Sequence, residues 1–189
     1  MSNWLHDFPL SPEKIVELRD KNPIRIERYR NTMREKRETK YRLAYMFMSH
    51  KIGTISKKEL LIAGLFLYWG EGTKTKRFSI GFTNTNPNMI IIFIKWLNLF
   101  HVSRSKLKIH LHLYSDMDIE KQKNFWSKKL NIPLSQFRKP YIKKSLLSSI
   151  TYSNSFKEGT CSVILENGDI TNKVLMGIKY VQDILLLKN

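Results

Sequence analysis

The feature that most constrains this chain is an apolar stretch, Lys58–Gly72, with the sequence KELLIAGLFLYWGEG. No charged residue occurs from Leu60 to Trp69, and the apolar side chains are not confined to one stripe of a helix. A helix that is apolar on all sides is normally buried. The uncharged stretch of ten residues is too short to cross a bilayer, which takes roughly 20 residues. The sequence therefore predicts a helix buried in the core of a soluble fold.

The end of this helix carries an acidic residue in an unfavourable place. Gly72 has the position of a glycine that ends a helix with a positive φ. Glu71 comes just before it, at the negative end of the helix dipole, where a carboxylate is disfavoured by about 0.3–1 kcal/mol. A metal ion or the side chain of Lys74, Lys76 or Arg77 could relieve this repulsion. One interpretation is a solvent-facing glutamate at a frayed helix end, and the other is a helix that delivers a carboxylate to a functional site.

The 189-residue chain is strongly basic, with a net charge of +17 and a pI of about 10.0. Such a charge favours a polyanionic partner, nucleic acid before an anionic membrane surface. The single cysteine, Cys161, excludes an internal disulfide and a cysteine-based zinc site, and it is typical of a reducing compartment. The first residues have neither the basic nor the apolar region of a signal peptide. No dinucleotide fingerprint, phosphate-binding glycine loop or Ser-His-Asp set is present, so we expect no small-molecule cofactor.

The pattern along the chain predicts two domains, a basic helical arm over residues 1–55 and an α+β domain over residues 56–189. Within the arm we expect a short helix that begins at Ser11 and Pro12, followed by a long, charge-dense helix over residues 24–50. Several cations of the long helix have an acidic residue three or four positions away, which indicates a solvated helix crossed by ion pairs. The alternative is an arm that follows the phosphates of a nucleic acid.

Alternation of apolar and polar residues predicts strands with one buried face in the second domain. The clearest strand is Lys106–Tyr114. Four of its residues would face the core, namely Leu107, Ile109, Leu111 and Leu113. The opposite face would present cations, imidazoles and a phenol, which suit phosphates and base edges, namely Lys106, Lys108, His110, His112 and Tyr114. A metal site at the two histidines and a merely solvent-exposed face are the alternatives.

Two further strands and three helices complete the expected α+β fold, a small antiparallel or mixed sheet with one face covered by helices. The strands are Arg77–Thr83, with Phe78, Ile80 and Phe82 inward, and Gly159–Glu166, with Cys161, Val163 and Leu165 inward. The helices cover residues 87–100, 118–130 and 171–187. Residues 134–144 offer an additional strand, which Pro140 restricts to a sheet edge.

The end of the Lys58–Gly72 stretch resembles the signature helix of the LAGLIDADG homing endonuclease superfamily. Gly70–Gly72 matches the closing Ala-Asp-Gly of that signature, with Glu for Asp, and Ile62–Leu65 is similar to its opening Leu-Ala-Gly-Leu, displaced by two residues. The order of helix, polar-faced strand, polar turn and helix is also similar, although the family has a two-stranded ribbon where this sequence has room for one good strand. Ala63, Leu67 and Gly70 fall on one helical face, where small residues permit close helix packing.

The resemblance implies a homodimeric, Mg²⁺- or Mn²⁺-dependent endonuclease of double-stranded DNA, because the chain holds only one such helix. The residue 60–71 helices would pair at the dimer axis, and Glu71, with Gly70, would bind the metal. Gln136 and Lys139 are the residue types that the family places beside the metal, so we expect them to be catalytic with Glu71. Lys74 and Lys76 are the alternatives for the lysine, because they lie close to Glu71 in the sequence. Residues expected to contact nucleic acid are Lys74, Lys76, Arg77, Ser79, Thr83, Lys106, Lys108, His110, His112, Arg138, Lys143 and Lys144.

Two other functions are compatible with the same resemblance. One is a DNA-binding regulator that has lost cleavage, and the other is an RNA-binding intron-splicing cofactor. Each predicts an intracellular protein, either cytoplasmic and associated with the nucleoid or organellar, with no membrane partner.

Overall fold

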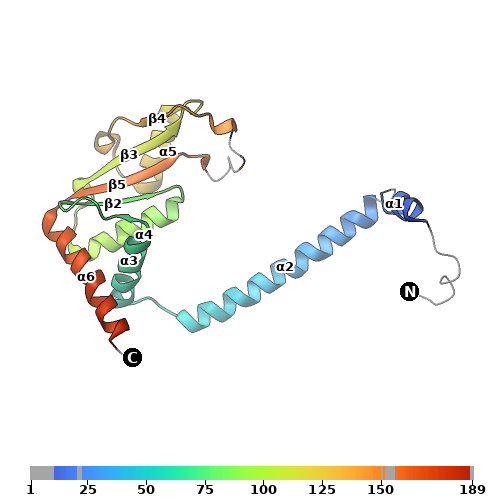
Figure 1. The fold of residues 1–189 in the computed structure, drawn as a ribbon, viewed down its shortest axis with the longest axis horizontal. Coiled ribbons are helices and arrows are strands. Elements are labelled where there is room, and N and C mark those ends of the chain that lie inside the picture. Colours follow the sequence, from blue (N-terminus) through green and yellow to red (C-terminus); the bar gives the residue numbers. More distant parts are fainter. Residues whose placement is uncertain (1–10, 21–22, 150, 152–155, 188–189) are drawn as a thin grey trace. The chain divides into compact units, whose positions relative to one another are not determined.

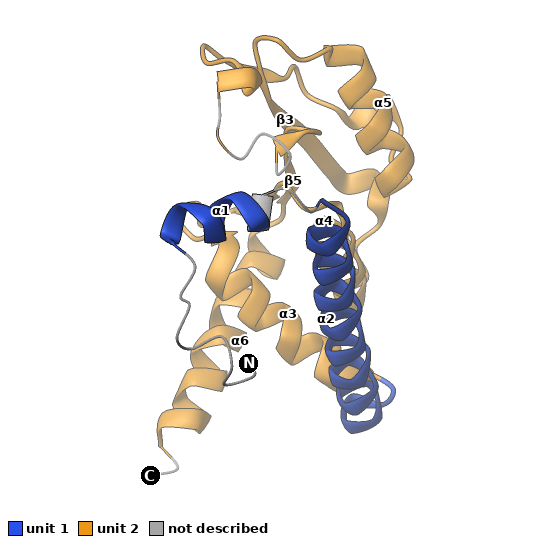
Figure 2. Ribbon diagram, turned by 90° about the vertical axis from the view of Figure 1, so that its right-hand side faces the viewer, with its two compact units in different colours: residues 1–54 blue, residues 55–189 orange. Residues whose placement is uncertain are grey.

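The computed structural model describes residues 11–20, 23–149, 151 and 156–187, and it separates into two compact units, residues 1–54 and 55–189 (Figure 2). The first unit contains α1 (Pro12–Asp20) and α2 (Pro23–Ile52). The helices that the arm sequence predicts are therefore present. The 30-residue α2 has no buried residue.

The second unit is an α+β fold built on a five-stranded mixed sheet (Figure 1). Its strands lie in the order β1 (Gly72–Thr73), β2 (Ser79–Asn84), β5 (Thr160–Glu166), β3 (Leu107–Tyr114) and β4 (Tyr141–Lys143). The pairs β1–β2, β2–β5 and β5–β3 are antiparallel, and β3–β4 is parallel. The expected edge strand is β4, so Pro140 immediately precedes a strand with a free edge.

The helices of this unit are α3 (Lys57–Glu71), α4 (Pro87–Leu97), α5 (Ile119–Leu130) and α6 (Gly168–Leu186). Side chains at their first turns explain where they begin. Ser56 and Glu59 form a capping box at the start of α3, with Ser56 N–H donating to Glu59 Oε2 at 2.7 Å and Glu59 N–H donating to Ser56 Oγ at 3.2 Å. Asn86, Asp118 and Asn167 accept from backbone N–H groups at the starts of α4, α5 and α6. Short 3₁₀ turns cover Asn98–Phe100, Arg104–Lys106, Leu134–Gln136 and Leu147–Ser149.

The core lies between the helices and one face of the sheet. The four apolar positions of β3 are 0–1% exposed, as their alternation predicts. The aromatic rings of Phe82 and Phe93 stack at 4.7 Å, and Trp96 continues this cluster beneath α3. Cys161 is fully buried, and this burial raises the pKa of its thiol far above the ordinary range, so it packs as a core residue.

The expectation that α3 is buried on all sides is wrong for the single chain. Only Gly64, Leu65 and Tyr68 are buried, because α4 and α6 cover just part of the helix. A Cβ at Gly64 would lie 2.0 Å from the Trp96 ring, so this glycine is where α4 approaches most closely. The uncovered side of α3 carries apolar residues that are 37–42% exposed, namely Ile62, Phe66 and Trp69.

Two expectations about the segment after α3 are also wrong. Gly72 has φ −78°, not a positive φ, and it starts a strand. A glycine is needed there because a Cβ would lie 2.2 Å from the Tyr68 ring. The strand after it begins at Ser79, so Phe78 lies in the preceding turn and is 79% exposed instead of buried. The two residues of β1 pair with β2, so a short two-stranded ribbon does follow α3 where the sequence had suggested a single strand.

Candidate nucleic-acid interface

The face of the sheet opposite the core carries polar side chains from three adjacent strands. The alternation of β3 directs Lys108, His110 and His112 to this side, and all three are half-buried. Pairing of β3 with β5 and of β5 with β2 puts His110 beside Ser162 and Ser162 beside Thr83. These strands therefore form one surface, the polar sheet face, that combines hydroxyl, imidazole and ammonium groups.

A shallow hollow of about 160 Å³ lies on the polar sheet face. Most of the residues that line it have polar side chains, and they come from β1, β2, β3, β5 and the turn before β2, namely Thr73, Lys76, Ser79, Gly81, Thr83, His110, His112, Ser162 and Ile164. A Cβ at Gly81 would lie 3.2 Å from Thr73 Oγ1, so the lack of a side chain at Gly81 leaves this part of the hollow open. The hollow is large enough for a phosphate or a few water molecules, but not for an ordinary cofactor.

Hydrogen bonds order the centre of this face. The hydroxyls of Thr83 and Ser162 lie 2.7 Å apart, and Ser162 Oγ is 3.3 Å from His112 Nε2. The rings of His110 and His112 are 4.8 Å apart. Burial, and then the nearby His110 and Lys143, lower the pKa of His112. A neutral His112 at pH 7 leaves this chain of groups able both to donate and to accept hydrogen bonds, which reading of base edges requires.

Glu166 neutralises part of the cationic charge at one end of the polar sheet face. Its Oε1 accepts from Arg138 at 2.6 Å, and its Oε2 accepts from Lys108. The hydrogen bonds from Lys108 and then Arg138 lower the pKa of this carboxyl, so it is ionised at pH 7. Both of these cations are among the residues predicted to contact nucleic acid. In the structure both of them donate to this carboxylate.

A cation and aromatic rings gather at the other end of β3. The ammonium of Lys143 lies 4.4 Å from the centre of the Tyr114 ring and 5.9 Å from that of Phe156. The ring centroids of Tyr141 and His112 are 5.7 Å apart, and Tyr141 is exposed. The exposed Tyr141 ring offers a stacking surface near this cation. The Tyr114 ring, which was expected on the open polar face of its strand, is instead 5% exposed and offers none.

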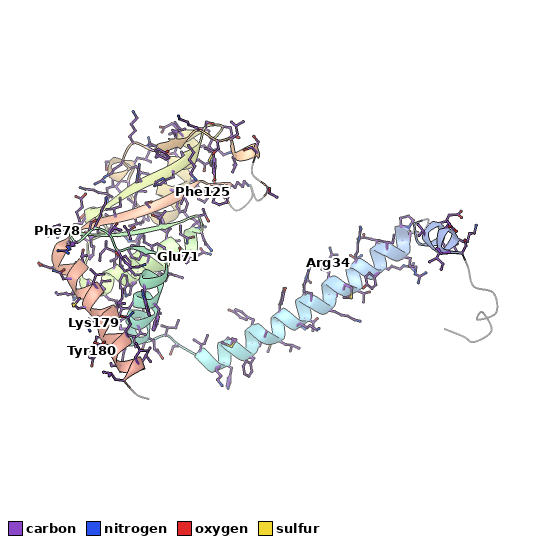
Figure 3. The ribbon with its side chains drawn as sticks, in the orientation of Figure 1. Arg34, Glu71, Phe78, Phe125, Lys179 and Tyr180 are labelled. Atoms are coloured by element: carbon purple, nitrogen blue, oxygen red, sulfur yellow. The ribbon has the colours of Figure 1, made fainter. Side chains whose placement is uncertain are left out.

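Glu71 lies at the end of α3, beside β1 (Figure 3). Its side chain is exposed and, among the described residues, has no hydrogen bond or ion pair. Of the cations that could relieve the repulsion at this helix end, Lys74 donates from its Nζ to the carbonyl of Trp69 at 2.7 Å. Gly70 is exposed, and a Cβ there would meet nothing within 4 Å. The last turn of α3 therefore presents an open surface with a single carboxylate.

The structure does not bring Gln136 and Lys139 close to Glu71 within one chain. Gly72, which follows Glu71, lies in one row across the sheet with Phe82, Val163 and Ile109. Three inter-strand spacings therefore separate Gly72 from Ile109, a distance of roughly 14 Å. The segment that contains Gln136 continues beyond Ile109, since Arg138 N–H donates to the Ile109 carbonyl. The amide of Gln136 donates to the carbonyls of Arg104 and Leu107, at 2.8 and 2.6 Å, and so fixes the start of β3.

The remaining predicted contacts lie around the rim of the polar sheet face. Lys74, Lys76 and Arg77 occupy the exposed turn between β1 and β2. Lys106 is exposed at the start of β3, and Lys144 is exposed after β4. Ser79 is 9% exposed and lies at the floor of the hollow.

Sequence reasoning missed several groups that shape this interface. The contact of Ser162 with His112 depends on the register of β5 against β3. Glu166 was read only as a strand end, and its two cationic partners lie 58 and 28 residues away in the chain. No local pattern in the sequence signals contacts of this kind.

No protein-family model, curated protein or solved structure gives a significant match to the chain. Within the described residues, no helix combines the length and apolar character needed to cross a membrane.

Proposed function

We propose that this chain binds double-stranded DNA through the polar sheet face. The observation that carries the proposal is a sheet whose strands β2, β5 and β3 bury one face and, in the part of the chain that the structure describes, present hydroxyls, imidazoles and cations on the other, in a chain of net charge +17. Lysine and arginine at the rim suit phosphates, and the ordered hydroxyl and imidazole groups at the centre suit base edges. The β1–β2 ribbon, with three cations in its turn, has the dimensions that a major groove admits.

The second step of the proposal is a homodimer formed through α3. Ile62, Phe66 and Trp69 expose apolar surface on one side of that helix, and the Phe66 and Trp69 rings lie 5.9 Å apart. The exposed Gly70 lets a second helix approach the same side closely. This arrangement supports the resemblance to LAGLIDADG proteins, as does the ribbon that follows α3. In such a dimer the polar sheet faces of two chains would read the two halves of a near-palindromic site.

The third step is hydrolysis of DNA phosphodiester bonds with Mg²⁺ or Mn²⁺. Among the described residues of one chain, no three of the side chains that commonly bind metals lie together. Mg²⁺ typically takes one or two carboxylates together with phosphate oxygens and water. The exposed carboxylate of Glu71 fits one such ligand, and a dimer supplies the second. A bound ion would stabilise charge on the phosphate and activate water, while the two glutamates hold it at the helix ends.

One observation favours a regulator that binds DNA without cleaving it. Gln136 and Lys139, the residues expected to assist the metal, lie across the sheet from Glu71, and the Gln136 amide is already engaged by two backbone carbonyls. A cleaving dimer would therefore need other groups to position the water, and Lys74 and Lys76 lie nearest in the chain.

The proposal of DNA binding is tested by neutralising lysines on opposite sides of the second unit. Lys76→Gln/Lys106→Gln removes two cations from the rim of the polar sheet face. Lys121→Gln/Lys128→Gln removes two exposed cations from α5, which packs on the core side. We expect the first pair to weaken duplex binding and to lower the slope of log K against log salt by about 1.8, or about 0.9 per phosphate contact. Equal effects of the two pairs would contradict binding through this face.

A further inference from the structure

The long helix α2 has a charge distribution that neither the fold nor the proposed interface uses. Between Pro23 and Ile52 it carries nine lysine and arginine residues and three glutamates, which is a net charge of +6. All its residues lie at the surface of its own unit, with none buried. Because α2 contributes no buried residue, we expect its role to depend on its exposed side chains and not on a hydrophobic core.

The excess charge of α2 lies on one side. Residues seven apart fall on almost the same line along a helix, since seven residues make nearly two turns. The three adjacent lines through Tyr29, Met33 and Arg30 contain no acidic residue and five cations, namely Arg30, Lys36, Arg37, Lys40 and Lys51. We call these five residues the cationic face of α2. The opposite three lines hold three arginines and three glutamates and are therefore neutral, namely Arg28, Arg34, Arg42, Glu27, Glu35 and Glu38.

Ion pairing does not neutralise the cationic face. Lys36, Arg37, Lys40 and Lys51 have no acidic residue three or four positions away, which is the spacing for a pair within a helix. Within the described part of the chain, none of the three glutamates of α2 forms an ion pair. Arg34, on the other side, donates to Asn31 Oδ1 at 2.7 Å (Figure 3). The positive charge of this face is therefore fully available to an external anion.

The arrangement of side chains distinguishes a nucleic acid from a membrane surface. A helix that lies in a bilayer interface needs an apolar face with its cations at the borders. In α2 the central line of the cationic face contains Lys40 between Met33 and Phe47, and Arg37 lies on the next line. Exposed Tyr29, Met33 and Phe47 are thus separated by cations, which is typical of a surface that contacts phosphates and sugars.

We infer that the cationic face of α2 binds the phosphate backbone of double-stranded DNA, in addition to the contact made by the polar sheet face. This inference rests on the proposed function of the sheet. The distance along the helix from Arg30 to Lys51 is roughly 32 Å at 1.5 Å per residue, which is about one turn of the duplex. The contact is independent of sequence, because phosphates carry no base identity.

The test compares two double variants of the full-length chain that remove equal charge from opposite sides of α2. Arg30→Gln/Arg37→Gln changes the cationic face, and Arg28→Gln/Arg42→Gln changes the neutral side. All four residues are exposed, and glutamine and arginine have similar helix propensity, so both variants should keep the helicity seen by circular dichroism. Binding is measured by fluorescence anisotropy on a random duplex of about 30 base pairs, roughly three helical turns.

We expect Arg30→Gln/Arg37→Gln to lower the slope of log K against log salt by about 1.8 and to weaken binding roughly 30-fold at 0.15 M salt. Arg28→Gln/Arg42→Gln should stay close to the wild type. Equal losses for the two variants, or no loss for either, would overturn the inference while leaving binding by the sheet intact. A wild-type chain that does not bind the duplex refutes the proposed function itself. If Arg30→Gln/Arg37→Gln bound phosphatidylserine vesicles less well but bound the duplex like the wild type, the inference would be wrong and the partner of this face would be a membrane surface.

Discussion

Replacement of Glu166 by glutamine is expected to strengthen DNA binding, which is an unusual outcome for a change on a binding surface. The Glu166 carboxylate accepts hydrogen bonds from both Lys108 and Arg138 on the polar sheet face. Glutamine keeps the size of the side chain and removes its charge. Two cations are then no longer neutralised, and a carboxylate that would repel phosphates is gone.

The size of this effect follows from the number of cations released. If one of the two meets a phosphate, the slope of log K against log salt rises by about 0.9, and affinity at 0.15 M salt rises roughly fivefold. If both do, the slope rises by about 1.8 and affinity rises roughly 30-fold. The side chains of Lys108, Arg138 and Glu166 are 44–50% exposed, so solvent screens these pairs and folding stability should hardly change.

The assay is anisotropy on a random duplex at several salt concentrations, with Glu120→Gln as the matched control. Glu120 pairs with Lys123 at 2.9 Å on α5, away from the polar sheet face. Its replacement changes the net charge of the chain by the same amount. Equal affinities of the Glu166→Gln and Glu120→Gln proteins would refute the assignment of this face, because only net charge would then matter.

Two further predictions concern folding. Gly64→Ala would put a Cβ 2.0 Å from the Trp96 ring and should lower the free energy of unfolding by about 1–3 kcal/mol, whereas Gly70→Ala meets nothing within 4 Å and should raise it by up to about 1 kcal/mol. Equal urea midpoints for these two variants would contradict the packing of α3 on α4. The pKa of His112 is lowered in the fold, so the unfolded chain binds a proton more readily and stability should fall as the pH drops through about 6.5. His112→Gln should flatten that part of the pH profile in urea unfolding, and an unchanged profile would contradict the burial of the imidazole.

The parts of the fold with strong local patterns could be predicted from the sequence. The strand β3 alternates from Leu107 to Leu113, so its buried and polar sides there follow from the residues alone. Tyr114 departs from this pattern and is buried. The capping box of α3 and the asparagine at the start of α4 are also local sequence signals, and both are present in the structure. Interactions of this kind span three or four residues and need no knowledge of the rest of the chain.

The surroundings of α3 could not be predicted, because hydrophobicity does not say what covers each side of a helix. The residues between Leu60 and Trp69 are apolar on every side, and the structure covers only the sides that meet α4 and α6. The role of Gly64 depends on the distant Trp96. Gly72 likewise looked like a helix stop, while its real constraint is the ring of Tyr68.

The candidate site was predicted in part. The cations and histidines of the polar sheet face follow from alternation, but their partners Ser162 and Glu166 come from another strand. Gln136 was assigned by residue type, and only the sheet order reveals that it lies across the sheet from Glu71. Strand order and register are long-range properties, and they decide which residues of a sheet meet.

The most direct test of the whole account is a paired measurement on wild type and Glu71→Gln. DNA affinity is measured in Ca²⁺, and nicking of supercoiled DNA is measured in Mg²⁺ or Mn²⁺. We expect wild type to bind and to nick, and Glu71→Gln to bind as well or more tightly but not to nick, because glutamine lacks the charge that holds the metal. A wild type that binds but never nicks would instead identify a regulator. A Glu71→Gln protein that cuts at the wild-type rate would contradict the proposed role of the α3 carboxylate.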